Sequence, residues 1–439
     1  MSARLVALPL DWSDPAAVFA GGLGAEEHAF WLDAGPAADA GFSWLGLGTP
    51  AERPPRELSL TPPDTTAATT PGPFRGGWIG WEGYDAAAGR AGAPARVDGG
   101  DGPPQLWLRV DWFVAVDHAA HAMWLLAPEH LIAEAAERVG RWARVGSARR
   151  SDVPPAVVSR AASARQTPDA YRALIEACRA AIRAGDAYQL CLTTRFTVAA
   201  STPFDPVSTY LALREQLPAH HGGIIRSGAT ALLSASPEQF LEVRDGSVRT
   251  RPIKGTRPRG HDRRQDDALR RELRESVKER AENVMIVDLM RNDLQRVCVP
   301  GTVSVDRLLD VESYSAVHQL VSTVTGRLSP GTTLGELLDA AFPAGSMTGA
   351  PKLSAMTLLH ALEGGARGLY AGCFGWVGHD GSADLAMTIR SIVLGRTGAY
   401  VGAGGGITWL SDAAEEVAEV GVKARGPLAV LGAELPPGW

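Results

Sequence analysis

The spacing of apolar residues is clearest after residue 165, where it predicts strands and amphipathic helices. Apolar residues recur at helical intervals behind a Thr167-Pro168 start, and the next segment alternates apolar and polar residues as a half-buried strand does. The pair Asp245-Gly246 is typical of a two-residue hairpin turn. These patterns predict a helix over 167–185, a strand over 187–198, a hairpin over 240–253, a loop over 254–260, a helix over 264–293, a strand entering a glycine turn over 399–409, and a helix from Ser411 or Asp412 to about Arg425.

The first 150 residues build their core differently from the rest of the chain. Nine of the twelve tryptophans lie there. Two strand-like stretches, GGWIGWEGYD (76–85) and QLWLRVDWFVAVD (105–117), belong to this part. The polar, Pro/Ala-rich stretch 145–166 has the composition of a linker. We therefore expect a separate N-terminal region over residues 1–150.

Composition and charge narrow the class of protein. Of the 439 residues, 45% are hydrophobic and 21% charged, the balance of a globular protein and not of a disordered or coiled-coil chain. This length fits one large body or two fused pieces. A net charge of -6 implies no surface for nucleic acid. The chain shows neither an apolar run long enough to span a membrane nor a signal peptide at its start. The four cysteines are scattered and form no CxxC pair, so we expect a soluble, cytoplasmic protein without disulfides.

Two predicted helices carry pairs of glutamates three residues apart. Glu279 and Glu282 share a stripe with the apolar Ile286, which places them on a partly buried face. Glu416 and Glu419 repeat this spacing near the C-terminus. A solvated, salt-bridged helix face explains either pair alone. The two pairs together fit a hard divalent cation, and an oxygen-rich ligand set suits Mg²⁺ rather than zinc.

Three further features could bind or attack a small acidic molecule. The glycines at 402 and 404–406 precede a helix, where exposed amides can hold a carboxylate, although a sharp turn also explains them. Arg390 ends an apolar strand and could form either a structural salt bridge or a carboxylate fork. Lys254 lies beside a basic loop, where neighbouring cations and burial would lower its pKa and make it a nucleophile; the alternative is a surface lysine without a chemical role.

Six ordered motifs resemble those of the chorismate-utilising enzymes. This family includes anthranilate synthase component I, aminodeoxychorismate synthase component I, and the isochorismate and salicylate synthases. The motifs are RPIKGTRPRG (251–260), KERAENVMIVDLMRNDL (278–294), GSMTGAPKLSAM (345–356), YAGCFGWVGHDGSADLAMTIRSIV (370–393), VGAGGGI (401–407) and EEVAEVGVK (415–423). The first 150 residues match loosely, through GGWIGWEGYD. The resemblance implies an α+β fold of two facing antiparallel β-sheets with helices packed outside, and a chorismate-binding catalytic region over 165–428.

Two positions separate the members of this family. The isochorismate and salicylate synthases carry a water-activating lysine where this chain has Gln189. Anthranilate synthases read PIAGTRPRG where this chain reads PIKGTRPRG, and Lys254 is the mark of the aminodeoxychorismate synthases. The resemblance thus implies component I of the latter enzyme, which converts chorismate and ammonia to 4-amino-4-deoxychorismate for p-aminobenzoate and folate synthesis. In that chemistry the lysine attacks C2 and expels the C4 hydroxyl, and ammonia entering at C4 then displaces the lysine.

The resemblance also assigns roles to the other matching positions. Lys254 is the expected nucleophile, and Glu238 is the expected general acid for the C4 hydroxyl. The expected Mg²⁺ ligands are Glu279, Glu282, Glu416 and Glu419. The expected substrate contacts are Arg390, Tyr370, Ser346, Gly404, Gly405, Gly406, Lys423, Gln189 and Thr256.

Departures from the family pattern leave alternatives open. Gln319 stands where anthranilate synthases have a histidine, with His318 just before it, so the role of an imidazole there is undecided. The chain carries no LLES-type motif, so feedback inhibition by tryptophan is not predicted. It carries no Cys/His signature of a class I amidotransferase, so a separate glutaminase subunit is expected to supply ammonia. Anthranilate synthase component I is the alternative function. A silent ligand-binding subunit and a pyridoxal enzyme with Lys254 as its Schiff base are alternatives from other classes.

Overall fold

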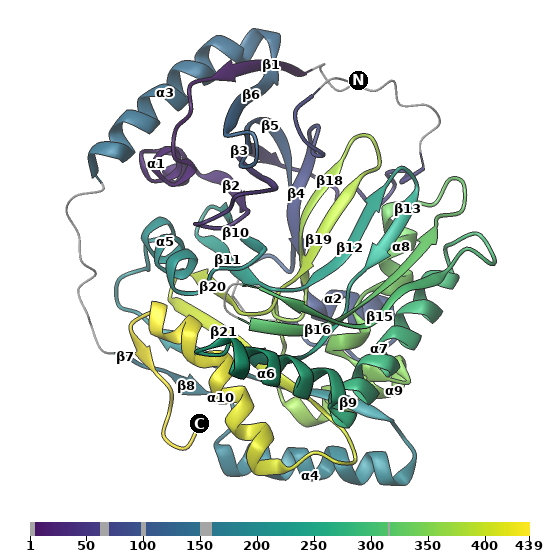
Figure 1. Cartoon of the computed structure of the whole chain (residues 1–439). Coiled ribbons are helices and arrows are strands. Elements are labelled where there is room, and N and C mark those ends of the chain that lie inside the picture. Colours follow the sequence, from purple (N-terminus) through teal and green to yellow (C-terminus); the bar gives the residue numbers. More distant parts are fainter. Residues whose placement is uncertain (1–4, 62–69, 98–101, 150–159, 315–316) are drawn as a thin grey trace.

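The computed structural model describes residues 5–61, 70–97, 102–149, 160–314 and 317–439 and has an α+β architecture built on antiparallel strands (Figure 1). Twenty strands join in one hydrogen-bonded network that passes through two layers. The first layer runs in the order β9 (Gln189–Ala199), β21 (Gly398–Ile407), β20 (Ser391–Gly395), β11 (Thr230–Ser236), β10 (His221–Ser227), β2 (His28–Asp33), β3 (Phe42–Pro50), β5 (Gln105–Asp117), β6 (Ala122–Pro128) and β1 (Leu5–Leu10), with the short strands β8 (Ser163–Ala164) and β17 (Gly349–Ala350) beside β9.

The second layer continues from the long strand β5. Its order is β5, β4 (Gly77–Glu82), β18 (Cys373–Gly378), β19 (Ala383–Met387), β12 (Gln239–Arg244), β13 (Ser247–Thr250) and β16 (Val317–Arg327), which also pairs with β14 (Ile253–Pro258) and β15 (Ser304–Ser313). One edge of β5 pairs with β3, while its other edge pairs first with β4 and then with β6. Strand β5 therefore belongs to both layers and joins them.

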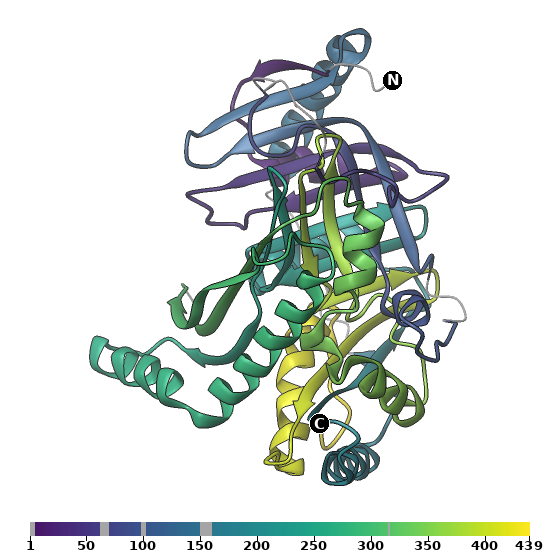
Figure 2. The ribbon, with the colours of Figure 1, turned by 90° about the vertical axis from the view of Figure 1, so that its right-hand side faces the viewer.

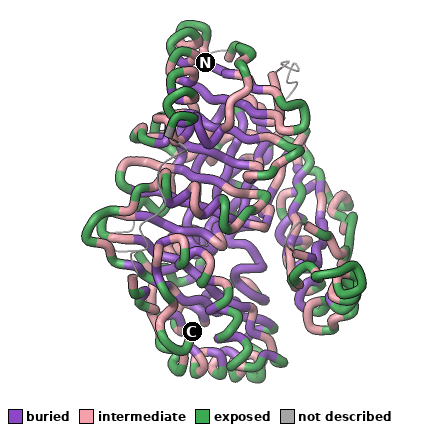
Figure 3. Tube along the Cα trace, turned by 60° about the vertical axis from the view of Figure 1, so that its left-hand side comes forward, coloured by how far each residue is buried: buried purple, intermediate pink, exposed green. Residues whose placement is uncertain are grey.

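The space between the layers is filled by large apolar side chains from both. Trp44 on β3 and Trp376 on β18 meet edge to face with ring centroids 5.9 Å apart, and Phe74 packs against Trp376 at 5.3 Å. Figure 3 shows that the buried residues are concentrated in the strands, whereas helices and loops carry most of the exposed ones. The expected α+β fold of facing antiparallel layers is confirmed.

Helices cover the outer faces of both layers. Those on the first layer are α1 (Pro15–Ala20), α3 (Ile132–Arg149), α4 (Pro168–Ala184), α5 (Pro206–Gln216), α9 (Lys352–Glu363) and α10 (Ala413–Val430). Those on the second are α2 (Tyr84–Arg90), α7 (Val277–Gln295) and α8 (Leu334–Ala341). Helix α6 (Arg263–Glu275) projects from the body beside α7 and buries only Leu273 (Figure 2). Among the described residues, no helix is long and apolar enough to cross a bilayer.

The elements with strong local signals form as predicted. Helix α4 has Thr167 as N-cap, with its side chain accepting the Ala170 amide, and Gly185 in the left-handed conformation after its last turn. The hairpin β12–β13 turns at Asp245 and Gly246, both at positive φ. Helix α10 is capped by Asp412 and runs past the expected end to Val430.

Three predicted elements are wrong. The segment 254–260 is largely a strand, because β14 pairs with β16 across more than sixty residues of sequence, as in the pair Thr256–Gln319. The single helix over 264–293 is two helices, because Ser276 leaves helical geometry and caps α7 instead. The glycines at 404–406 lie inside β21 and not in a turn, because each is opposite a residue of β9.

The segment expected as a linker is partly regular structure. Helix α3 extends to Arg149, residues 150–159 lie outside the described residues, and β7 (Arg160–Ala161) then pairs in parallel with β22 (Ala433–Glu434). Strands of the first 150 residues also pair with later ones, β2 with β10 and β4 with β18. The first 150 residues thus share hydrogen-bonded layers with the rest of the chain.

Candidate active site

Strand β14 places Lys254 inside the protein. Gly255 has a φ of 80° and lies where the register of β14 against β16 shifts between Ile253 and Thr256, so the strand bulges beside the lysine. The Lys254 side chain is 15% exposed, and its Nζ lies 4.0 Å from Oε2 of Glu282 on α7. The lysine is therefore neither on the surface nor in a loop.

The electrostatics of Lys254 differ from the expectation. Burial lowers its pKa, but the carboxylates of Glu282, Glu238 and Glu419 together raise it above its usual value. Arg257, a cation of the basic loop that was expected to lower the pKa of Lys254, binds carboxylates instead. Its guanidinium forms two hydrogen bonds with Glu272, at 2.5 and 2.8 Å, and lies 3.5 Å from Glu279. In the protein alone the ammonium form of Lys254 is thus favoured.

The carboxyl of Glu238 lies at the junction of β11 and β12 and is buried. Burial raises its pKa from 4.5 to about 7, against opposing effects of Lys254, of a hydrogen bond from Ser346 and of Lys423. Ser346 lies in the short 3-10 turn Gly345–Met347. A carboxyl with a pKa near 7 holds a proton at neutral pH that it can release, which is the property of a general acid.

The side chains of Gln189 and Lys254 lie close to the backbone of the glycine-rich strand β21. Both polar atoms of the Gln189 carboxamide are buried without a hydrogen-bond partner among the described residues. A β-carbon on Gly406 would lie 2.4 Å from Nε2 of Gln189 and 3.3 Å from Nζ of Lys254. The pairing of β21 with β20 ends at Val401, so no described strand pairs with the edge of β21 opposite β9 at Gly404–Gly406, where Lys423 donates to the Gly404 carbonyl. Two unsatisfied groups and an open strand edge face the lysine, as a binding site for a polar molecule would require.

Arg390 and Tyr370 form the other side of the site. Arg390 follows β19 with a φ of 51°, and its guanidinium makes no hydrogen bond or ion pair to any described residue. Burial lowers the pKa of Arg390, opposed by Tyr370 and Glu419. Tyr370 is 7% exposed, and Gly402 makes room for its ring, since a β-carbon there would be 2.1 Å from Cγ. A half-buried cation without a carboxylate partner fits an anionic ligand.

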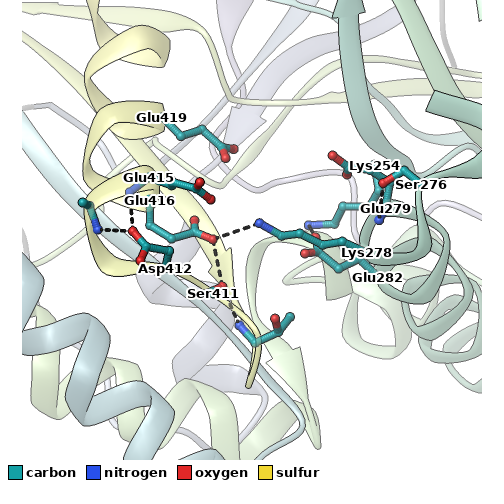
Figure 4. A network of polar contacts seen from close by, with 12 residues as sticks. Lys254, Ser276, Lys278, Glu279, Glu282, Ser411, Asp412, Glu415, Glu416 and Glu419 are labelled. Carbon is teal, nitrogen blue, oxygen red and sulfur yellow. Dashed lines mark hydrogen bonds and ion pairs between the residues drawn. The ribbon is translucent and has the colours of Figure 1, made fainter. Parts of the chain in front are cut away.

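The four glutamates come from two helices that face each other, α7 and α10 (Figure 4). Cations of the chain separate them. Lys278 pairs with Glu416 at 3.3 Å, and Lys423 pairs with Glu419 at 2.7 Å while donating to the Gly404 carbonyl at 2.8 Å. No three acidic, histidine or cysteine side chains of the described residues converge on one point that could hold a metal ion.

The donor chemistry of these glutamates nevertheless fits a hard cation. One carboxylate oxygen of Glu282, Oε1, is buried and has no hydrogen-bond partner in the described ranges, and burial raises the pKa of this group. Glu416 is 3% exposed, and besides Lys278 it accepts a hydrogen bond from Ser411 at 2.8 Å. Carboxylate oxygens at this depth are stabilised by a bound cation.

The structure also locates residues that sequence patterns did not single out. Lys278, one position before Glu279, stands between the two helices, and its place next to an ExxE pair was the available signal. The hydroxyl of Thr388, two residues before Arg390, is buried and has no hydrogen-bond partner within the described part of the chain. His318 is structural, because its ring contacts Ser313 at 2.7 Å and Asp266 at 3.0 Å.

Two expected positions lie differently from the rest. Thr256, an expected substrate contact, is exposed on β14. Gln319, opposite it on β16, is buried. Of the expected residues, the structure thus gathers the lysine, the acid, the arginine and the four glutamates around one region and leaves Thr256 at its edge.

Comparison with known proteins identifies the class. Residues 46–429 match the family described as chorismate binding enzyme, so the chain belongs to that family. It is 40% identical over 377 residues to an aminodeoxychorismate synthase of Streptomyces pristinaespiralis, covering 83% of this chain and 52% of that protein. It is 37% identical over 450 residues to anthranilate synthase component 1 of Streptomyces coelicolor, covering 96% of this chain and 87% of that protein.

The fold agrees with these relatives. The chain superposes on anthranilate synthase component I from Streptococcus pneumoniae TIGR4 with a TM-score of 0.72 at 28% identity, covering 97% of this chain and 92% of that one. The chain spans about half the length of the aminodeoxychorismate synthase that it matches. The family is therefore established by both sequence and fold.

Proposed function

We propose that the chain is component I of an aminodeoxychorismate synthase, which converts chorismate and ammonia to 4-amino-4-deoxychorismate and water. The observation that carries this proposal is a buried amine, Lys254, beside an acid, Glu238, whose pKa is about 7. The similarity to an aminodeoxychorismate synthase of Streptomyces supports it.

The two groups divide the reaction between them. The Lys254 ammonium first passes a proton to the Glu238 carboxylate, which gives a neutral amine and a carboxylic acid. The amine then attacks C2 of the ring, the double bonds shift, and the C4 hydroxyl leaves as water with the proton of Glu238. Ammonia then attacks C4, the double bonds shift back, and the bond from C2 to the lysine nitrogen breaks. The proton lost by the entering nitrogen restores Glu238, so the chain returns to its starting state.

The remaining groups hold the substrate. Arg390 and Tyr370 bind its enolpyruvyl side, and the open edge of β21 offers amides to a carboxylate. Ser346 and Gln189 supply polar contacts within the site. Mg²⁺, for which the expected ligands are Glu279, Glu282, Glu416 and Glu419, supplies positive charge for the ring carboxylate when it is bound.

Incubation of the pure chain with chorismate, Mg²⁺ and an ammonium salt, followed by mass spectrometry, tests the proposal. We expect 4-amino-4-deoxychorismate from the wild type and none from Lys254→Ala. Lys254→Arg is the matched variant, because it keeps the positive charge but not the nucleophile. An active Lys254→Arg variant would show that the residue acts only as a charge.

Anthranilate synthase component I is the second candidate. Its specific support is the relative from Streptomyces coelicolor, which matches 96% of this chain. That reaction eliminates pyruvate and gives a fluorescent aromatic product. Release of pyruvate from chorismate by the pure chain would favour this candidate over the first.

A separate glutaminase subunit is the proposed source of ammonia. Glutamine hydrolysis of the class I type needs a reactive thiolate. The four cysteines of the chain are buried, and burial raises the pKa of Cys178 to about 12 and of Cys298 to about 11. We therefore expect the pure chain to use an ammonium salt but not glutamine. Amination with glutamine alone would contradict this.

A further inference from the structure

A buried arginine lies under the site without belonging to the proposed catalytic groups. Arg367 follows α9, and its guanidinium forms a fork with Glu363, Nε donating to Oε2 at 2.9 Å and Nη2 to Oε1 at 2.7 Å. The two side chains are 1% and 4% exposed. Glu363 also accepts the amide and the hydroxyl of Thr193 on β9, each at 2.9 Å. A buried pair of this kind is tolerated only when its donors and acceptors are satisfied.

The rest of the fork reaches the backbone of two segments that carry expected substrate contacts. Nη1 of Arg367 donates to the carbonyl of Met347 at 2.6 Å, and Nη2 donates to the carbonyl of Cys191 at 2.8 Å. Met347 directly follows Ser346, and Cys191 lies on the same face of β9 as Gln189. One planar group therefore joins the Ser346 turn to β9.

The N-terminal motif GGWIGWEGYD braces this arginine. The ring centroid of Tyr84 lies 4.1 Å from Cζ of Arg367, a cation–π contact. The Asp85 carboxylate accepts the amides of Arg367 at 3.4 Å and of Gly368 at 2.7 Å. The last two residues of the motif thus contact the Arg367 guanidinium and the backbone amides of Arg367 and Gly368.

We propose that Arg367 is a positioning residue for the acid end of the site: it holds the Ser346 turn against β9 and so keeps the Ser346 hydroxyl on the Glu238 carboxyl. The inference rests on the proposed function in taking Glu238 as the general acid. The groups that face Glu238 are Ser346, Lys254 from β14 and Lys423 from α10. Of these three, only Ser346 lies on a segment that Arg367 contacts.

The consequence is a measurable change in the acid. The Ser346 hydrogen bond lowers the pKa of Glu238, whereas burial raises it. In Arg367→Lys the charge beside Glu363 remains, but an ammonium cannot span the two carbonyls as the planar fork does. The turn is then free to shift, and the hydroxyl is lost from the carboxylate.

Infrared difference titration of the Glu238 carboxyl, with Glu238→Gln as the spectral reference, tests this directly. We expect Arg367→Lys and Ser346→Ala each to raise the titration midpoint, by up to about 1 pH unit. The double variant should show no further rise beyond Ser346→Ala. The limb of the pH–rate profile that reports this acid should move with it.

Arg214→Lys is the matched control. Arg214 is a second buried arginine, 8% exposed, whose guanidinium hydrogen-bonds to Asp33, Glu215 and Gly35 and to none of the described residues of the Ser346 turn. It should lose thermal stability and leave the midpoint unchanged. If Arg367→Lys does not fold, Tyr84→Leu replaces it, and a smaller rise is expected because the bonds of the fork remain.

Three results would overturn the inference: a midpoint unmoved by the change at Arg367 or at Tyr84, a midpoint unmoved by Ser346→Ala, or additive rises in the double variant. The titration needs no product. Absence of amination therefore overturns the proposed function alone, whereas an unmoved midpoint in an aminating enzyme overturns the role of Arg367.

Discussion

A methyl group added at Gly406 tests whether the close packing of Gln189 against β21 is needed for catalysis. In Gly406→Ala the new β-carbon would lie 2.4 Å from Nε2 of Gln189, where an ordinary contact begins near 3.4 Å. The carboxamide must therefore move by about 1 Å. A displacement of this size in a group that orients substrate can lower the rate about 100-fold. We expect kcat/KM for chorismate with an ammonium salt to fall by about that factor.

The fold should survive this change. Gly406 lies in β21 without a positive φ, and the atoms nearest the new methyl are the ends of two side chains, Gln189 and Lys254. Gly395→Ala is the control, because a β-carbon there meets nothing nearer than 4.0 Å. Both variants should melt close to the wild type. A folded Gly406→Ala variant with wild-type kcat/KM would refute the reasoning, since Gln189 could not then be held near the reacting atoms.

Three further predictions concern charge. Burial raises the pKa of Glu238 from 4.5 to about 7, so the free energy of unfolding should fall by about 3 kcal/mol as the pH rises through that window. Glu238→Gln should therefore unfold at higher urea than wild type at pH 8 but not at pH 4. Equal stability of the two proteins at pH 8 would contradict this. Lys278→Met leaves Glu416 without its cation, so in the presence of a chelator this variant should melt at a lower temperature than wild type. Mg²⁺ should then raise the Tm of the variant more than that of wild type. A rise no larger than in wild type would exclude these carboxylates as the cation site. Arg214→Met leaves the buried Asp33 carboxylate without its cation, and urea unfolding should show a loss of about 3–5 kcal/mol in the free energy of unfolding, whereas a loss below about 1 kcal/mol would contradict a stabilising role for this ion pair.

Sequence patterns predicted the elements whose signals are local. Thr167 and Gly185 bound α4, and Asp245-Gly246 turns the β12–β13 hairpin, because a cap or a tight turn depends on a few neighbouring dihedral angles. The resemblance to the chorismate-utilising enzymes added the fold and the identity of the expected site residues. Periodicity alone placed Glu279 and Glu282 on one face, but it could not place Glu416 opposite them.

The failed predictions share a cause. Residues 254–260 are mostly strand because β16, far along the chain, offers its edge to them, and the glycines of β21 are strand because β9 does. The pKa of Lys254 is raised and not lowered, because Arg257 pairs with Glu272, fifteen residues away in sequence, while carboxylates from other elements lie close to the lysine. Strand pairing between distant segments can override the local secondary-structure preference, and a short window of sequence does not contain the distant partner.

By itself, the sequence determined the caps, the turns, the alternation of the strands and the residue types that chemistry on a small acidic ring requires. Only the tertiary structure decided that Lys254 is buried beside Glu282, that Glu238 carries a proton near neutral pH, and that Arg367 joins β9 to the Ser346 turn. The reason is physical: burial and electrostatic fields are sums over every neighbour in space, and most of those neighbours are distant in sequence.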